Sequence, residues 1–336
     1  MNTTGTAGAL RDTEIDIRTL RYFVAVAEEL SFTRAAERLF VAQQAISRDI
    51  GQLERRLGTQ LLVRTTRRVS LTPEGQRLLA RARELIALHD QLLDELGAST
   101  RPIVIDLLSE GRLTGPRILE AVRQAAPDLE FRGRYEGGLG RAIRRLQSGE
   151  IDLALGRADW VGRSSKTGLS TRLIRLEALA VLLPAAHPLA TERDVPVAAL
   201  AGMEVDVNLA NPDAPEWSDL SRQFLALSGA SATPPHLPAV GVEEQAHHLT
   251  RQGVPILTGV DHAPIPGGVV RRLVDPVPIY PWSLVWRSGL QPRILAPVET
   301  AAADLAAEGG WLELPDGAWL PEPEASRGLR GRAGVV

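Results

Sequence analysis

Cysteine is absent from the 336-residue chain, which excludes disulfides, thiolate metal sites and a cysteine nucleophile. Aromatic residues make up only 4 %, so the cores must be filled mainly by Leu, Val, Ile and Ala. The longest apolar run, ALAVLLPAA from Ala178, is far shorter than the ~20 residues of a membrane span. Residues 1–14 lack the charged and apolar regions of a secretory signal. These absences predict a soluble, cytoplasmic protein with no membrane partner.

The formal net charge of −3 is unevenly distributed along the chain. Between Ser31 and Arg83 the sequence holds eleven arginines and four acidic residues, a surplus of seven positive charges. The remainder therefore carries a surplus of ten negative charges. This separation favours an anionic partner for the N-terminal part, with nucleic acid first in line. An arginine-rich surface that is merely solvated is the alternative.

Three short helices and a basic hairpin are predicted at the N-terminus. The apolar residues between positions 20 and 27 follow the i, i+3, i+4, i+7 spacing of an amphipathic helix. Ser31 can cap a second helix, and Ile46, Ile50 and Leu53 form the inner face of a third. The segment LLVRTTRRVSLT then predicts two short strands around a basic turn. None of these helices can bury its apolar stripe alone, so they must pack together.

The third helix has the pattern of a helix that reads DNA. Its first turns carry polar side chains, and its opposite face is apolar enough to dock on the other helices. Glutamine can pair with adenine in the major groove, serine with bases or phosphates, and arginine with guanine or phosphate. Arginines on the hairpin would neutralise phosphates or enter the minor groove. The predicted DNA-contacting residues are Gln43, Gln44, Ser47 and Arg48 on the helix, and Arg64, Arg67 and Arg68 on the hairpin. A three-helix packing module with a polar surface is the alternative.

A long helix is predicted to follow, with Thr72 as its N-cap and Pro73 in its first turn. Three series of residues then repeat every seven positions, which favours a seam for the same helix of a second subunit. The series are Leu78, Leu85 and Leu92; Leu79, Ile86 and Leu93; and Ala82, His89 and Leu96. A long core helix within one domain is the alternative.

Beyond residues 97–102 short strands alternate with helices, which predicts βαβ units and a mainly parallel sheet. Ligands of open α/β sheets lie beyond the C-terminal ends of strands, between lobes. The residues that follow the predicted strands are therefore candidates for binding a small molecule. They are Ser109, Glu110, Glu136, Arg157, Asn208 and Thr258. Ser109, Asn208 and Thr258 could equally be turn or cap residues with local hydrogen bonds.

The segment from Asp16 to about Leu79 resembles the winged helix-turn-helix of LysR-type transcriptional regulators. It contains the SFTRAAERL second helix, which adds Thr33 to the predicted DNA contacts, the Q-x-x-x-S-R turn, LERRLG and LTPEG. RPIVIDLL, GEIDLAL, AAHPLA and WSLVWR resemble stretches of the family's effector domain more loosely. Two positions depart from the family pattern. Ala42 removes a side-chain N-cap worth about 1 kcal/mol, and Gln44 stands where many relatives have Pro.

The resemblance implies a multidomain protein that combines α+β and α/β parts. A disordered tail at 1–14 precedes a winged helix-turn-helix at 15–72 and a dimerisation helix at 73–98. An effector domain like a periplasmic binding protein follows at 101–310, with lobes at 101–160 plus 269–310 and at 168–268. Residues 311–336 form a tail. The implied partners are promoter double-stranded DNA, a small-molecule effector and further copies of the chain as a dimer or tetramer, with RNA polymerase as a further candidate. No cofactor and no enzymatic activity are expected.

Three other patterns were weighed against this prediction. GGLG at 137–140 is half of a dinucleotide fingerprint, but its third glycine is absent. Glu244 and His248 share a helix face, yet no third metal ligand is evident, which favours a solvated helix and no metal. Hydrolase, zincin and P-loop motifs are missing, which argues against an enzyme. Two other functions stay open: an architectural DNA-binding protein, and a small-molecule-binding module whose basic N-terminus is incidental.

Overall fold

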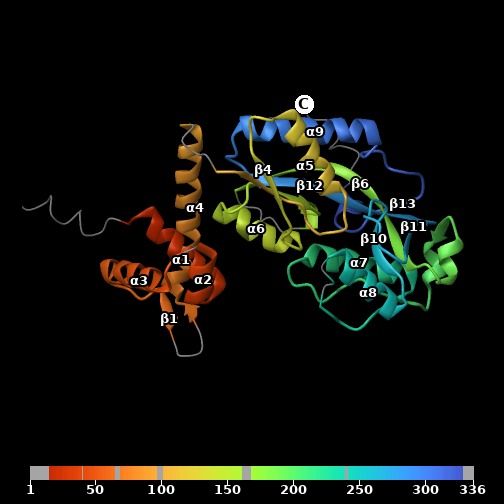
Figure 1. Ribbon diagram of the computed structural model, residues 1–336, viewed down its shortest axis with the longest axis horizontal. Coiled ribbons are helices and arrows are strands. Elements are labelled where there is room, and N and C mark those ends of the chain that lie inside the picture. The colour runs from red at the N-terminus through yellow and green to blue at the C-terminus, as the bar shows by residue number, and fades with distance from the viewer. Residues whose placement is uncertain are drawn as a thin grey trace, which may run out of the picture. The chain divides into compact units, whose positions relative to one another are not determined.

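The computed structural model describes residues 15–39, 41–64, 69–96, 101–160, 168–237, 239 and 241–327. The predicted N-terminal tail and the hairpin tip with Arg67 and Arg68 lie outside these residues. The chain divides at Thr100–Arg101 into an N-terminal and a C-terminal unit (Figure 1). In the part of the chain so described, every helix is too short or too polar to cross a membrane.

The N-terminal unit contains the predicted helices, hairpin and long helix. Its elements are α1 (Ile17–Glu29), α2 (Phe32–Leu39), α3 (Gln43–Leu57), β1 (Leu62–Arg64), β2 (Val69–Leu71) and α4 (Pro73–Glu95). β1 and β2 pair antiparallel. The core is formed by the inner faces of all four helices together with the residues that lead into β1. The predicted amphipathic stripes therefore meet in one cluster, as none of them could be buried alone.

Helix α4 begins where the sequence predicts and divides its two faces between different roles. The Thr72 hydroxyl accepts a hydrogen bond from the Gly75 amide at 2.9 Å, which caps the helix. Ala82 and Ile86 are buried in the core of their own unit, so their predicted place on an intermolecular seam is wrong. Of the predicted seam residues, Leu85, Leu92 and Leu93 are exposed on α4 and Leu96 is exposed just after it, and Leu88 is a further exposed leucine of the helix. Figure 1 shows this helix extending away from the other helices of its unit.

The C-terminal unit is built on a nine-stranded sheet in the order β4-β3-β5-β12-β6-β11-β7, with β10 beside β6 and β13 beside β12. The strands are β3 (Ile103–Asp106), β4 (Phe131–Arg134), β5 (Leu153–Gly156), β6 (Leu169–Pro184), β7 (Asp194–Pro196), β10 (Ile256–Gly259), β11 (Gly268–Val274), β12 (Val277–Arg287) and β13 (Ala318–Trp319). β8 (Glu204–Val205) and β9 (Ser231–Ala232) pair separately. The sheet is mixed rather than mainly parallel, because the long strands β6 and β12 pair antiparallel with each other and with most neighbours.

The long strand β6 belongs to both lobes of this unit. Its residues up to Ala178 pair with β12, and those from Leu179 onward pair with β10 and β11. The chain returns to the first lobe between β11 and β12, at residues 275–276. The crossovers therefore lie inside β6 and after β11, and not at the predicted positions 160–168 and 268. A single strand that runs through both lobes gives no turn or loop at which to place the boundary.

Helices cover both faces of each lobe. They are α5 (Thr114–Ala125), α6 (Leu139–Ser148), α7 (Pro215–Ser228), α8 (Val242–Gln252), α9 (Pro292–Gly309) and α10 (Glu324–Arg327), with 3-10 turns at Ala158–Trp160, Pro188–Thr191 and Val197–Leu200. On β5, Leu153 and Leu155 face the cluster of α5 and α9, and Ala154 faces that of α6. Figure 1 shows α5 and α9 together on one side of this sheet and α6 on the other. In the second lobe α7 and α8 pack against opposite faces in the same way.

Residues 311–327, here called the C-terminal segment, are docked on the unit. The Leu176 amide donates to the Trp311 carbonyl at 2.7 Å, and β13 pairs with β12. Glu324 in α10 is buried. The Pro, Gly and Glu content of this segment predicts a tail. Its buried Trp and Glu make it part of the folded domain instead.

Candidate functional site

The polar residues of α3 lie on its free face. Its buried face consists of Ile46, Ile50 and Leu53. Gln43, Gln44 and Arg48 are exposed, as is Thr33 in the first turns of α2. Ala42 occupies the N-cap position without a side-chain hydrogen bond, so the first amides of α3 lack a side-chain partner there. The first two turns of α3 therefore present two side-chain amides, from Gln43 and Gln44, and the guanidinium of Arg48.

Arg64 on the hairpin is engaged within the protein. Its guanidinium lies 3.3 Å from the Ser47 hydroxyl and 2.9 Å from a Glu54 carboxylate oxygen, and it stacks over the Phe32 ring. The other Glu54 oxygen accepts hydrogen bonds from the amides of Leu61 and Leu62. Arg64 and Glu54 thus fix the hairpin against α3. Contact of Arg64 and Ser47 with DNA stays a prediction.

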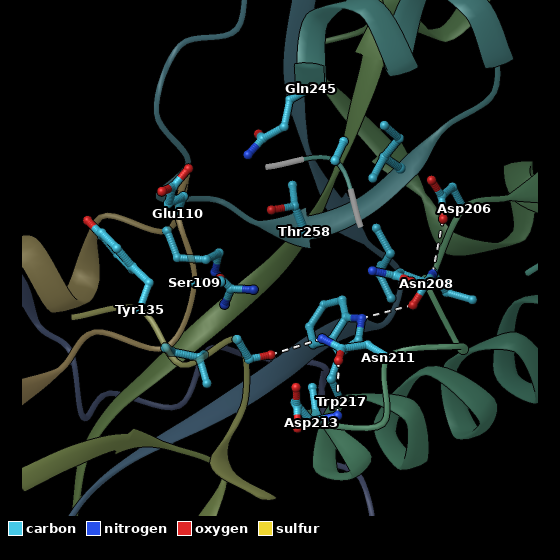
Figure 2. Close-up of a pocket in the computed structure, with 18 of the residues that line it drawn as sticks. Ser109, Glu110, Tyr135, Asp206, Asn208, Asn211, Asp213, Trp217, Gln245 and Thr258 are labelled. Atoms are coloured by element: carbon cyan, nitrogen blue, oxygen red, sulfur yellow. Dashed lines mark hydrogen bonds between the residues drawn. The ribbon is translucent and has the colours of Figure 1, made fainter. Parts of the chain in front are cut away.

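A cavity of about 470 Å³ lies between the two lobes of the C-terminal unit. Its volume is in the range of small-molecule sites in proteins. The first lobe contributes the loops after β3 and β4, and the second contributes the start of α7, α8, β10 and the chain after β8. Five of the six residues predicted to bind a ligand line it, as Figure 2 shows for four of them. The five are Ser109, Glu110, Glu136, Asn208 and Thr258.

Most charged side chains around the cavity are paired within the protein. Glu136 lies 3.2 Å from Arg141 and 3.1 Å from Arg145. Arg112 lies 2.6 Å from Glu177, among the rings of Trp217, Tyr280 and Trp282. The pairing leaves hydroxyl and amide groups as the principal sites at which a ligand can form new hydrogen bonds.

Two buried carboxyl groups near the cavity have raised pKa values. Burial raises the pKa of Glu216, at the cavity wall, to about 7, against the lowering effect of the Leu139 amide. Burial also raises the pKa of Asp106 to about 7, although one of its oxygens accepts hydrogen bonds from the amides of Leu108 and Glu136. Near neutral pH the cavity wall therefore carries less negative charge than its number of acidic residues suggests.

Asn208 provides an unused acceptor in the cavity. Its backbone is left-handed, with φ of 46°, a conformation that Asn tolerates better than most residues. Its backbone amide donates to the Asp206 carboxylate at 3.0 Å. Its side-chain oxygen is buried and accepts no hydrogen bond from the described residues. A buried oxygen without a donor costs about 1–3 kcal/mol. A ligand that donates to this oxygen would recover that free energy.

Arg157 does not reach the cavity, so its predicted role in effector binding is wrong. It is 0 % exposed, with its guanidinium 2.7–2.8 Å from both Glu324 oxygens and 2.8 Å from Asp219. It also donates to the carbonyls of Glu216 and Glu322. Arg157 therefore ties the end of β5 in the first lobe to α7 in the second lobe and to the C-terminal segment.

The cavity wall also holds a group of three residues that the sequence does not predict. Asp206 lies between His236 and His248, with its two oxygens 2.9 Å and 2.6 Å from their Nε2 atoms. Burial opposes ionisation, but the hydrogen bonds from both histidines hold the pKa of Asp206 below its ordinary value. The sequence points to His248 only through the neighbouring acids on α8, whereas its partners come from other elements.

Two of the three glycines at 137–140, Gly138 and Gly140, serve packing between the lobes. A Cβ on Gly138 would lie 2.2 Å from the Asp213 carbonyl oxygen, and one on Gly140 would lie 2.8 Å from Pro215. The start of α6 and the start of α7 can approach each other only without these side chains.

A winged helix-turn-helix joined to a two-lobed α/β unit with a central cavity defines a class of DNA-binding proteins that carry a ligand-binding domain. Residues 17–76 match the family described as bacterial regulatory helix-turn-helix proteins of the lysR family, and residues 111–306 match the LysR substrate binding domain. The chain belongs to the family of LysR-type transcriptional regulators, as the sequence predicts.

Individual relatives agree with this assignment. The HTH-type transcriptional regulator BenM of Acinetobacter baylyi is 38 % identical over 186 residues, which are 54 % of this chain and 59 % of BenM. The match thus spans less than two thirds of that relative. The structure of full-length BenM has a TM-score of 0.51 at 28 % identity and covers 90 % of this chain and 100 % of BenM. CbnR, solved as a complex with its target DNA, has a TM-score of 0.56 at 22 % identity, covers 86 % of this chain and 99 % of CbnR, and shows the same fold.

Proposed function

We propose that this protein is a sequence-specific DNA-binding regulator of transcription that responds to a small molecule bound between its two C-terminal lobes. The cavity lined by Ser109, Asn208 and Thr258, on the same chain as the exposed polar face of α3, carries the proposal. Because promoter DNA lies in the cytoplasm, the proposed location of the protein is the cytoplasm. RNA polymerase is a proposed partner, since a transcriptional regulator acts on it. The proposal gives the chain no catalytic role.

DNA binding is assigned to α3, with Gln43, Gln44, Ser47 and Arg48, and to Thr33 on α2. Arg64 and the predicted Arg67 and Arg68 of the hairpin are assigned to phosphates or the minor groove. The surplus of seven positive charges between Ser31 and Arg83 supports this assignment. CbnR, a family member of the same fold, has been solved with its target DNA.

Gln43→Ala is expected to relax base preference while leaving general DNA affinity in place. A good bidentate contact discriminates between bases by about 1–3 kcal/mol, so affinity for the preferred site should fall by ~5–150-fold. The site is first selected with the wild-type protein from a random DNA pool, and binding is then measured on that site and on random DNA. Gln52→Ala, exposed further along the same helix, is the matched control and should change neither. An equal loss on both DNAs would mean that α3 does not read bases through Gln43.

Effector binding is assigned to the cavity, with Ser109, Glu110, Glu136, Asn208 and Thr258 as its lining. Because the charged groups are largely paired, the proposed effector is a small polar molecule that donates a hydrogen bond to the Asn208 side-chain oxygen. Its apolar part would lie against Trp217, an aromatic residue that Figure 2 shows in the cavity wall.

A thermal-shift screen of the full chain with small carboxylates, amino acids and aromatics is expected to yield a ligand that raises Tm. Asn208→Gly retains the left-handed backbone but removes the acceptor, so the affinity of that ligand should fall about 10-fold. Glu192→Ala, at an exposed position away from the cavity, should bind as the wild type does. Binding that is insensitive to Asn208→Gly would place the ligand elsewhere.

The exposed leucines of α4 support assembly of the chain with a second copy of itself. Leu85, Leu88 and Leu92 follow one stripe of this 23-residue helix, beside the face on which Ala82 and Ile86 are buried in their own unit. We extend the proposal to a homodimer through α4, with a tetramer as a further step.

A further inference from the structure

Three metal-ligating side chains converge on the second-lobe wall of the cavity. Asp206 follows β8, His236 follows β9, and His248 is on α8. One ligand atom from each of the three lies within 4.8 Å of the other two. The imidazole centroids are only 4.4 Å apart, and both rings direct Nε2 at the Asp206 carboxylate. The three residues come from separate parts of the chain, so they meet only in the folded protein and not through the spacing of one helix or strand.

The surroundings fix the orientation of these groups. The backbone of Asp206 is held from both sides, because its amide donates to the Pro255 carbonyl and its carbonyl accepts from the Leu257 amide. His236 Nδ1 lies 2.8 Å from the Leu237 carbonyl oxygen, which can only accept, so Nδ1 carries a proton. Nε2 faces Asp206, and it presents a lone pair once its own proton is displaced. A ring N–H that donates to a backbone carbonyl is the usual outer contact of a metal-binding histidine.

We propose that Asp206, His236 and His248 bind a divalent transition-metal ion of the zinc class at the wall of the cavity. Two imidazoles and one carboxylate suit Zn²⁺, Co²⁺ or Ni²⁺, whereas Mg²⁺ and Ca²⁺ prefer all-oxygen sites. An ion between the three groups would replace the protons that now lie between the Nε2 atoms and the carboxylate. Such ions sit about 2.0–2.2 Å from nitrogen and oxygen ligands, so the three groups must move slightly apart to admit one.

Three protein ligands leave at least one coordination position open, as in zinc sites that bind water or substrate rather than sites that only stabilise a fold. All three residues line the cavity, so this position faces the space assigned to the effector and ions can enter from it. A bound ion would attract an anionic or hydroxyl group of a ligand. The metal site rests on its own geometry and stands whether or not the cavity binds an effector.

The test is a titration of the untagged, chelator-treated full chain with Co²⁺, followed by displacement with Zn²⁺. We expect one ion per chain and the visible absorption of Co²⁺ with nitrogen and oxygen ligands, lost when Zn²⁺ is added. His236→Ala and His248→Ala should each weaken binding by more than ~100-fold, since removal of contacts outside the coordination shell already costs 10–100-fold. His247→Ala is the matched control: it removes the exposed neighbouring imidazole on α8 and should leave binding unchanged.

Absence of Co²⁺ and Zn²⁺ binding in the wild type would overturn the proposal and leave the three residues as a hydrogen-bonded network only. Equal losses in His247→Ala and His248→Ala would also overturn it, because binding would then involve the α8 surface in general. Far-UV circular dichroism of each metal-free variant shows whether it is folded. If an alanine variant fails to fold, His248→Gln takes its place. Glutamine retains a hydrogen-bond donor toward Asp206 but has no imidazole, so this variant should lose metal binding to the same degree.

Discussion

Arg157→Met is expected to destabilise the folded protein by about 3–5 kcal/mol, measured as the free energy of unfolding of the C-terminal unit within the full chain. The substitution removes the cation between Glu324 and Asp219 and leaves the buried Glu324 carboxylate without its partner. It also removes the donor to the carbonyls of Glu216 and Glu322. Methionine fills much of the volume, so the loss of charge pairing dominates over the loss of packing.

Arg193→Met is the control for a general effect of arginine loss, because Arg193 is 98 % exposed and its substitution should change stability by less than about 0.5 kcal/mol. The double variant Arg157→Met with Glu324→Met removes both charges of the closest pair. It should be more stable than Arg157→Met alone, since no carboxylate then stays buried opposite an apolar side chain. A variant that keeps wild-type stability but loses effector affinity would show instead that Arg157 contacts the ligand.

Arg157 also shows where reasoning from the sequence fails. The rule that ligands lie beyond strand ends identifies Arg157 correctly as a residue at the end of β5. It does not tell which way the side chain turns after the strand. Arg157 turns toward Glu324, a residue 167 positions away in a segment whose composition indicates a tail. Only the folded chain brings these two residues together.

At other strand ends the residues selected by the same rule do line the cavity, for a physical reason. Ser109 and Glu136 follow β3 and β4, Thr258 lies in β10, and the cavity forms where these strand ends meet. The buried stripe of α3 is equally accessible from the sequence, since Ile46, Ile50 and Leu53 repeat at helical spacing. The group of Asp206, His236 and His248 could not be predicted from the sequence. Asp206 follows β8, His236 follows β9 and His248 is on α8, so no periodic pattern connects them. The spacing of apolar residues predicts which face of a single helix or strand is buried. Contacts between elements can be known only from the folded structure.

The second large effect concerns assembly. Leu88→Glu combined with Leu92→Glu is expected to convert the proposed dimer to a monomer and to lower affinity for the selected DNA site by at least ~100-fold. In the chain itself these side chains are 63 % and 52 % exposed, and in the part of the chain that the structure describes the other face of α4 already packs on α1. Two leucines four residues apart, flanked by the exposed Leu85 and Leu96, form the kind of stripe that pairs with a second helix. Carboxylates placed there would be desolvated and would repel each other across the pair.

The loss of DNA affinity follows from the loss of a linked second reading helix. Two linked sites bind up to 10²–10⁴-fold more tightly than one, without any new contact. The assembly state is measured by light scattering on the eluted protein, and DNA affinity is measured at constant salt.

Gln76→Glu combined with Ala80→Glu places the same charges at the same spacing on exposed positions of α4 outside the stripe, and it should stay dimeric. Both double variants should fold, since all four positions are exposed in the single chain and such substitutions change stability by about 0.5 kcal/mol or less. If Leu88→Glu with Leu92→Glu remains dimeric, α4 is not the interface, and the two DNA-binding units must be joined through the C-terminal unit instead.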